Sequence, residues 1–194
     1  MKRRHLAHLV LMPAALLFVA PLVWMALTAF MPDTDINTYP PKLWPEHFTL
    51  AGFTRIFTED DYPRWLANTV IVAGAGVLGH VALCSLAGYG FARLRFRGRG
   101  VAFGAIMATI MVPAQVLMIP TFLLFKNLNL IDTLGAAIVP WLASAFGVFL
   151  MRQFFLSLPK ELEEAATIDG CSRLGVFFRV VLPLARPALA TLVV

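Results

Sequence analysis

The sequence has 194 residues, of which 59% are hydrophobic and 14% charged, and its formal net charge is +5. Soluble domains carry about 25% charged residues, so this composition excludes an ordinary soluble protein. The basic residues lie between long apolar runs, which favours a membrane protein over a nucleic-acid-binding protein. The two cysteines, Cys84 and Cys171, stand alone in the sequence, so neither a disulfide framework nor a metal site is predicted.

Five apolar segments are predicted to be membrane-spanning helices. They are Leu9 to Phe30, about Val70 to Ala92, Val101 to about Phe125, Leu134 to Met151, and a fifth that begins near Pro183. The first is longer than the apolar region of a signal peptide and no cleavage site follows it, so it is expected to be retained. A helix needs about 20 residues to cross the hydrocarbon core. The segment from Pro183 to Val194 is shorter, so the chain is expected to be incomplete at its C-terminus.

The distribution of Lys and Arg predicts the orientation of these spans. One side of the membrane would hold Lys2, Arg3, Arg4, Arg93, Arg95, Arg97, Arg99, Arg152, Lys160, Arg173, Arg179 and Arg186. The other would hold Lys42, Arg55, Arg64 and Lys126. The N-terminus is therefore expected in the cytoplasm. The cluster from Arg93 to Arg99 is interpreted as a topology anchor in contact with phospholipid.

Residues 31–65 are predicted to form an external loop that is acidic and rich in proline, with a short helix near Phe53 to Phe57. Two roles stay open for this loop: it receives an external partner, or it only caps the spans.

The interiors of the predicted spans contain no Asp, Glu, Lys or Arg, and Arg186 near the start of the fifth is counted with the basic residues outside the membrane. His80 is the one ionisable candidate, and a hydrogen bond to a neighbouring helix is favoured over a role in a proton relay. The glycines at positions 74, 76 and 79 match the spacing of a dinucleotide-binding motif, but they lie inside a predicted span and no acidic residue follows at the required distance. The sequence also has no Walker motif for ATP. Energy for any transport is therefore expected to come from another subunit.

Residues 157–183 are predicted to form two short cytoplasmic helices around a glycine. Pro159 and the acidic residues that follow it suit a helix start, Gly170 suits a left-handed residue after the helix end, and Ser172 can cap the second helix. The expected apolar faces are Leu158, Leu162, Ala165 and Ala166 on the first helix, and Leu174, Phe177, Phe178 and Val181 on the second. Pro183 is expected to break the pattern where the fifth span starts. A docking element for a protein partner is favoured over a membrane-interface helix, because the polar face of the first helix is acidic.

This segment resembles the EAA loop of ABC importer permeases, normally written E-A-A-x3-G-x9-I-x-L-P. The matching residues are Glu164, Ala165, Ala166, Gly170, Val180 in place of isoleucine, Leu182 and Pro183. Asp169 before the glycine is similar to the carbohydrate-importing branch, of the maltose and glycerol-3-phosphate type. Further similarity includes Asn68-Thr69, Tyr89, Arg93, Pro113, Pro120 and the run from Phe149 to Phe155.

The resemblance implies an all-α, polytopic bundle of the ABC type I importer permease kind, forming a single domain over residues 1–194 in a bacterial inner membrane. It implies that Glu164, Ala165, Ala166, Asp169 and Gly170 dock on an ATPase subunit, and that Leu182 and Pro183 set the exit into the fifth span. Catalytic, metal and cofactor sites are not expected in this chain, because ATP and magnesium would bind the partner. The implied partners are an ATPase dimer, a second homologous permease, an external solute-binding protein and membrane lipid.

Two alternatives stay open beside a carbohydrate or polyol importer. An ion-coupled carrier or channel would need charge or a cation site within the membrane. A non-transporting scaffold would explain the cytoplasmic loop, but not the spans rich in glycine and proline. The residues that line the substrate path are not predicted.

Overall fold

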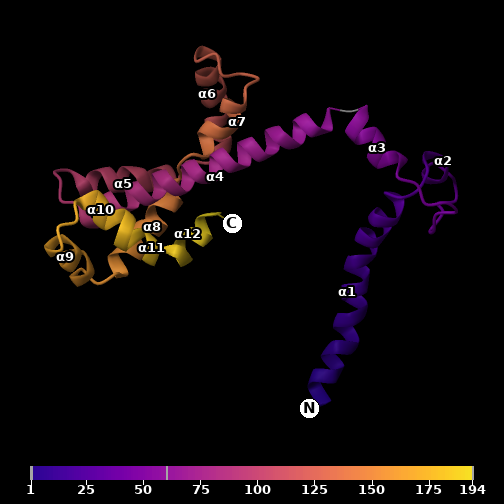
Figure 1. Cartoon of the computed structure of the whole chain (residues 1–194), viewed down its shortest axis with the longest axis horizontal. Coiled ribbons are helices and arrows are strands. Elements are labelled where there is room, and N and C mark those ends of the chain that lie inside the picture. The colour runs from indigo at the N-terminus through magenta and orange to yellow at the C-terminus, as the bar shows by residue number, and fades with distance from the viewer. Residues whose placement is uncertain (1, 60, 194) are drawn as a thin grey trace. The chain divides into compact units, whose positions relative to one another are not determined.

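The protein, a computed structural model, is described over residues 2–59 and 61–193, and every regular element in these ranges is a helix. The helices are α1 (Lys2–Thr28), α2 (Asp33–Ile36), α3 (Ala51–Thr58), α4 (Tyr62–Arg93), α5 (Arg99–Thr109), α6 (Ala114–Asn127), α7 (Leu134–Ile138), η1 (Val139–Trp141), α8 (Ala145–Ser157), α9 (Glu161–Ile168), α10 (Arg173–Val176), η2 (Phe177–Val181), α11 (Leu182–Leu184) and α12 (Arg186–Val193) (Figure 1). They form two compact units, whose boundary falls after Ala67 within α4.

The first unit contains α1 to α3 and the folded segment between α1 and α3. The Nζ atom of Lys42 lies 2.8 Å from carboxylate oxygens of both Asp35 and Glu46, and the Arg55 guanidinium lies 2.8 Å from the Asp33 carboxylate. The hydrogen bond from Lys42 lowers the pKa of Asp35, although burial of this carboxyl opposes the shift. Helix α3 confirms the short helix predicted in this segment. These contacts give residues 31–59 a defined structure of their own.

Two helices, α1 over Leu11–Thr28 and α4, are long and apolar enough to cross a membrane by themselves. Side chains on both helices remain exposed, including Phe18 at 80% and Leu78 at 73%. Such apolar exposure suits contact with lipid or with other helices rather than with water. The first two predicted spans are confirmed as long apolar helices.

The third and fourth predicted spans differ from continuous helices, because each consists of two helices that meet at a bend, and a further bend falls at Ala185, near the start of the fifth. The bends are 101° between α5 and α6, 42° between the α7–η1 segment and α8, and 76° between the α10–α11 segment and α12. Pro113 directly precedes α6 with extended ψ, and a proline disfavours helical backbone in the residue before it. Ser144 caps α8 by accepting a hydrogen bond from the Gly147 backbone N–H. If each bent pair counts as one span, the described residues provide up to five.

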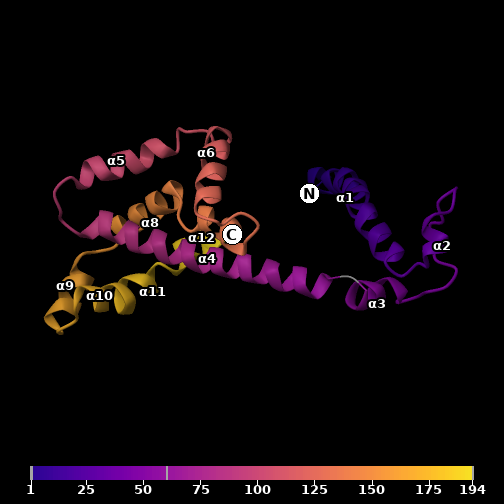
Figure 2. The same cartoon turned by 90° about the horizontal axis from the view of Figure 1, so that it is seen from above.

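In the second unit, α8 lies between α4 and α5 (Figure 2). Gly88 of α4 is placed directly against α8: a Cβ atom added there would lie 2.6 Å from Met151 Cβ and 2.9 Å from the Arg152 backbone nitrogen. Met151 itself is fully buried. The absence of a side chain at Gly88 therefore sets how closely the two helices approach.

Gly88→Ala is expected to destabilise the protein by roughly 1–3 kcal/mol, because backbone atoms of α8 would have to move. Gly90→Ala is the matched control on the same helix, since an added Cβ would meet no atom within 4 Å. Thermal unfolding of both variants in one detergent tests this. Equal midpoints for the two variants would show that the α4–α8 contact does not depend on Gly88.

His80 of α4 lies with its Nδ1 atom 3.0 Å from the backbone carbonyl oxygen of Trp141. Since Trp141 belongs to η1, this hydrogen bond joins two helical segments of the second unit. The predicted interhelical role of His80 is confirmed.

Candidate functional site

Helix α9 ends in a Schellman motif centred on Gly170. The Gly170 N–H donates to the Thr167 carbonyl at 3.1 Å, and the Cys171 N–H donates to the Ala166 carbonyl at 2.9 Å. Gly170 has φ +85°, which glycine adopts without the steric cost that a Cβ imposes. Ser172 Oγ then accepts a hydrogen bond from the Gly175 N–H and caps α10. The predicted helix–glycine–helix order is confirmed.

The apolar face predicted for the first helix is wrong in part. Leu158 lies in extended backbone between α8 and α9, where it packs against the core, and Ala166 is buried. Leu162 remains 43% exposed and Ala165 is also exposed. The prediction placed Leu158 on the same helix as the other three residues, but α9 begins only at Glu161.

The face predicted for the second helix is also wrong in part. Phe177 and Val181 are buried as expected, but the third buried residue is Val176, whereas Leu174 is 64% and Phe178 is 56% exposed. The reason is that residues 177–181 form a π-helical turn, in which positions five apart share a face. The chain also continues as helix through Pro183, and the break falls at Ala185.

A buried ion pair joins α9 to the end of α4. The Nε atom of Arg93 lies 2.6 Å from Glu163 Oε1, and the two side chains are only 6% and 17% exposed. Arg93 also donates a hydrogen bond from Nη2 to the Leu158 carbonyl at 2.6 Å, and Tyr89 donates its hydroxyl hydrogen to Glu163 Oε2 at 3.2 Å. We call Tyr89, Arg93, Glu163 and the Leu158 carbonyl the Arg93 junction. It connects the end of α4 to Leu158, which follows α8, and to Glu163 in the first turn of α9.

Aromatic rings pack next to this junction. The ring centroids of Tyr89, Phe155 and Phe177 are 5.0 to 6.3 Å apart and come from α4, α8 and η2 respectively. Phe155 and Phe177 are almost fully buried. A displacement of the α9–η2 segment would therefore disturb its contacts with α4 and α8, because packed side chains have few alternative arrangements.

The residues predicted for ATPase docking and for the exit into the fifth span differ in exposure. Glu164, Ala165, Asp169 and Gly170 are exposed on α9 and the turn that follows it. Ala166 is buried, and Leu182 packs against the core beyond the π-helical turn, while Pro183 is exposed on α11. Two apolar side chains of the same segment are also strongly exposed, Ile168 on α9 at 87% and Leu174 on α10 at 64%.

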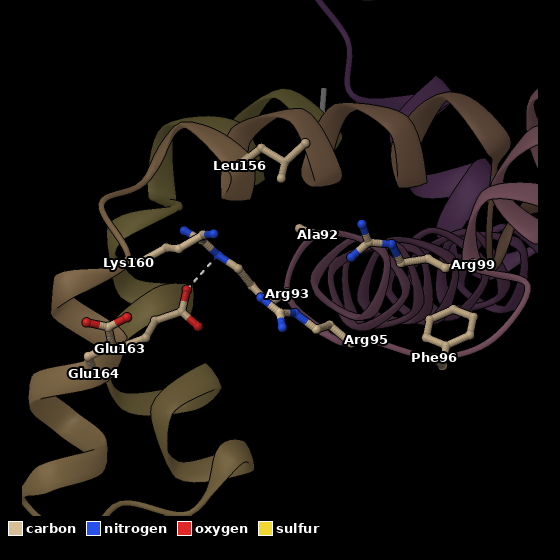
Figure 3. Close-up of a pocket in the computed structure, with 9 residues that line it drawn as sticks. All are labelled: Ala92, Arg93, Arg95, Phe96, Arg99, Leu156, Lys160, Glu163 and Glu164. Atoms are coloured by element: carbon tan, nitrogen blue, oxygen red, sulfur yellow. Dashed lines mark ion pairs between the residues drawn. The ribbon is translucent and has the colours of Figure 1, made fainter.

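The Arg93 junction was not predicted from the sequence. Two signals for it were present: Tyr89 and Arg93 are four positions apart and so share a face of α4, and Arg93 closes an apolar span. Neither signal selects Glu163 from the acidic residues at the start of α9. Figure 3 shows that Glu163 is turned toward Arg93, whereas Glu164 is directed away from it.

Residues 81–194 match the family described as "binding-protein-dependent transport system inner membrane component". The arabinooligosaccharides transport system permease protein AraQ of Halalkalibacterium halodurans is 37% identical over 183 residues, which are 93% of this chain and 66% of AraQ. The sn-glycerol-3-phosphate transport system permease protein UgpE of Yersinia enterocolitica is 34% identical over 195 residues, covering 96% of this chain and 69% of UgpE.

Among solved structures, a bacterial ABC transporter involved in the import of the acidic polysaccharide alginate is similar, with a TM-score of 0.84 and 28% identity. The match covers 99% of this chain and 68% of that one. The chain thus spans about two thirds of the length of these relatives. With its helical fold, its apolar helices and the match over residues 81–194, the chain belongs to the family of binding-protein-dependent transport system inner membrane components.

Proposed function

We propose that this chain is a permease subunit of an ATP-binding-cassette importer for a carbohydrate or a related glycerol phosphate. In this proposal it moves substrate by alternating access, driven by a separate ATPase subunit. The substrate class is supported by the relatives, whose names specify arabinooligosaccharides, sn-glycerol-3-phosphate and alginate. The Arg93 junction is the observation that carries the mechanism, because it joins the largely exposed helix α9 to the end of an apolar helix long enough to span the membrane.

The proposed docking surface on the ATPase consists of Glu164, Ala165, Asp169, Gly170 and Ile168. All five are exposed, and the small residues Ala165 and Gly170 would allow close approach of a partner. Ile168 would supply apolar area, since an isoleucine that is 87% exposed has most of its surface available for burial. Ala166 and Leu182 pack inside the chain, so their proposed role is to hold this surface in place.

The proposed assembly contains two ATPase subunits that bind ATP and magnesium, a second permease that is either homologous or another copy, and an external solute-binding protein. It lies in the bacterial inner membrane with the N-terminus of this chain in the cytoplasm. Residues 31–65 would then face the outside, and residues 157–183 would form the coupling loop. The orientation is supported by the concentration of basic residues at one end of the apolar helices.

Glu164→Lys tests the docking surface. Glu164 is exposed, so charge reversal there should leave folding nearly unchanged while placing the wrong sign at the interface. We expect retention of the ATPase subunit to fall by tenfold or more when the full-length permease is purified in mild detergent after co-expression. Glu59→Lys, an equal charge reversal in the external segment, should retain the ATPase. Equal retention by both variants would contradict the docking role of Glu164.

A further inference from the structure

A cavity of about 610 Å³ lies beside the Arg93 junction, between the ends of α4 and α8 and the starts of α5 and α9. It is lined by Ala92, Arg93, Arg95, Phe96, Arg99, Leu156, Lys160, Glu163 and Glu164. Figure 3 shows the side chains of Arg95 and Arg99 extending toward Arg93 and Ala92 respectively. The cavity thus gathers several cations that come from separate elements of the chain.

The positive charge of this cavity is only partly compensated within the chain. Glu163 pairs with Arg93, and Glu164, on the same helix α9, is the other carboxylate that lines the cavity, against the four cations Arg93, Arg95, Arg99 and Lys160. Within the described part of the chain, no carboxylate lies within 4.0 Å of the cationic nitrogens of Arg95, Arg99 or Lys160. Like charges brought together repel one another, so binding of an anion in the cavity would be favourable.

The walls of the cavity also include exposed apolar side chains. Phe96 is 48% and Leu156 is 42% exposed. The helices that meet here, α4 and α5, carry exposed apolar residues, as Leu86 at 43% and Val101 at 80% illustrate. A molecule that fits this cavity has an anionic group that pairs with the cations and a hydrocarbon part that contacts Phe96 and Leu156.

We infer that the cavity binds the phosphate of an anionic phospholipid, with an acyl chain along Phe96 and Leu156. Arg95 and Arg99 would donate hydrogen bonds to phosphate oxygens, which the planar guanidinium group does in pairs, and Lys160 would contribute a point charge. The cavity lies at the ends of apolar helices, which is the depth of lipid headgroups. An acidic protein segment would satisfy the charges but would leave the apolar rim without a matching group.

The experiment compares lipid retention by the purified, delipidated full-length permease. Phosphatidylglycerol or phosphatidylcholine is added and bound lipid is counted by native mass spectrometry. We expect the wild type to retain phosphatidylglycerol in preference to phosphatidylcholine. In the double variant Arg95→Gln, Lys160→Gln, each lost cation should weaken retention about fivefold, so both together should weaken it about twenty-five-fold. Both side chains are exposed, so the fold should be kept.

The matched control is Arg97→Gln, Arg179→Gln, which removes the same charge from exposed arginines outside the cavity. It should retain phosphatidylglycerol like the wild type. Equal losses in both double variants would show a general effect of charge and overturn the proposal, as would equal retention of the two lipids by the wild type.

Displacement of wild-type phosphatidylglycerol by millimolar inorganic phosphate would identify a phosphate site without lipid specificity. Displacement by an added ATPase subunit would assign the cavity to that partner. Either result would also overturn the proposal.

Discussion

Glu163→Ala is expected to lower the stability of the protein by about 3–5 kcal/mol, because it leaves the Arg93 guanidinium buried without its partner charge. This is a large fraction of the total stability of a typical domain, about 5–15 kcal/mol. The loss should be concentrated at the junction between α4 and α9. If α9 receives the motion of an ATPase, substrate uptake should fall even in molecules that are inserted normally.

Glu164→Ala is the control for this prediction, because it removes a carboxylate one residue away that is exposed. Its effect on stability should stay within about 0.5 kcal/mol. Denaturant unfolding of the purified variants gives the comparison, and membrane insertion is measured in parallel. If Glu163→Ala and Glu164→Ala unfold at the same midpoint, the Arg93–Glu163 pair has no structural importance.

The double variant Arg93→Met, Glu163→Leu separates the charge of this junction from its packing. Replacing both members of a buried ion pair with apolar residues is often neutral or stabilising, so the double variant should recover much of the stability lost by Glu163→Ala. Its uptake activity would then report what the ion pair itself contributes to transmission of motion. The carbonyl of Leu158 would still lose its hydrogen bond from Arg93.

Gly170→Pro is expected to have the second large effect. Proline fixes φ near −65°, whereas Gly170 has φ +85°, and proline also lacks the N–H that donates to the Thr167 carbonyl. The Schellman motif cannot form, at a cost of about 3 kcal/mol or more, and the exposed end of α9 would be redirected. We expect the full-length variant to insert in the membrane, to lose its ATPase subunit during purification and to stop importing substrate.

Gly170→Asn is the matched control, since asparagine tolerates the left-handed conformation and keeps the N–H. It should retain the ATPase and most of the transport activity. An inserted Gly170→Pro variant that still retained its ATPase and transported normally would show that the turn does not position the docking surface. Loss of the ATPase with both variants would instead point to a steric requirement for glycine at the interface itself.

Much of the local structure could be predicted from the sequence because its causes act over a few residues. Long apolar runs without charge require a nonpolar solvent and internally satisfied backbone groups, which predicts the helices α1 and α4. The turn at Gly170 and the cap at Ser172 depend on the backbone within one helical turn. The resemblance to the EAA loop could also be seen in the sequence, because all its matching residues lie within the continuous segment 164–183.

Only the tertiary structure decided which acidic residue faces Arg93 and which apolar residues are buried around α9. Glu163 and Arg93 are distant in the sequence, and their pairing requires the α8–α9 connection to return to the end of α4. The π-helical turn at 177–181 shifts the buried face, and a simple 3.6-residue period cannot show such a shift. The sequence by itself therefore determined the two long apolar helices, the turn and cap of the coupling loop, and the family, because propensity, capping and hydrophobic length are local. The Arg93 junction and the cationic cavity depended on long-range packing, because burial and charge pairing are properties of neighbours in space.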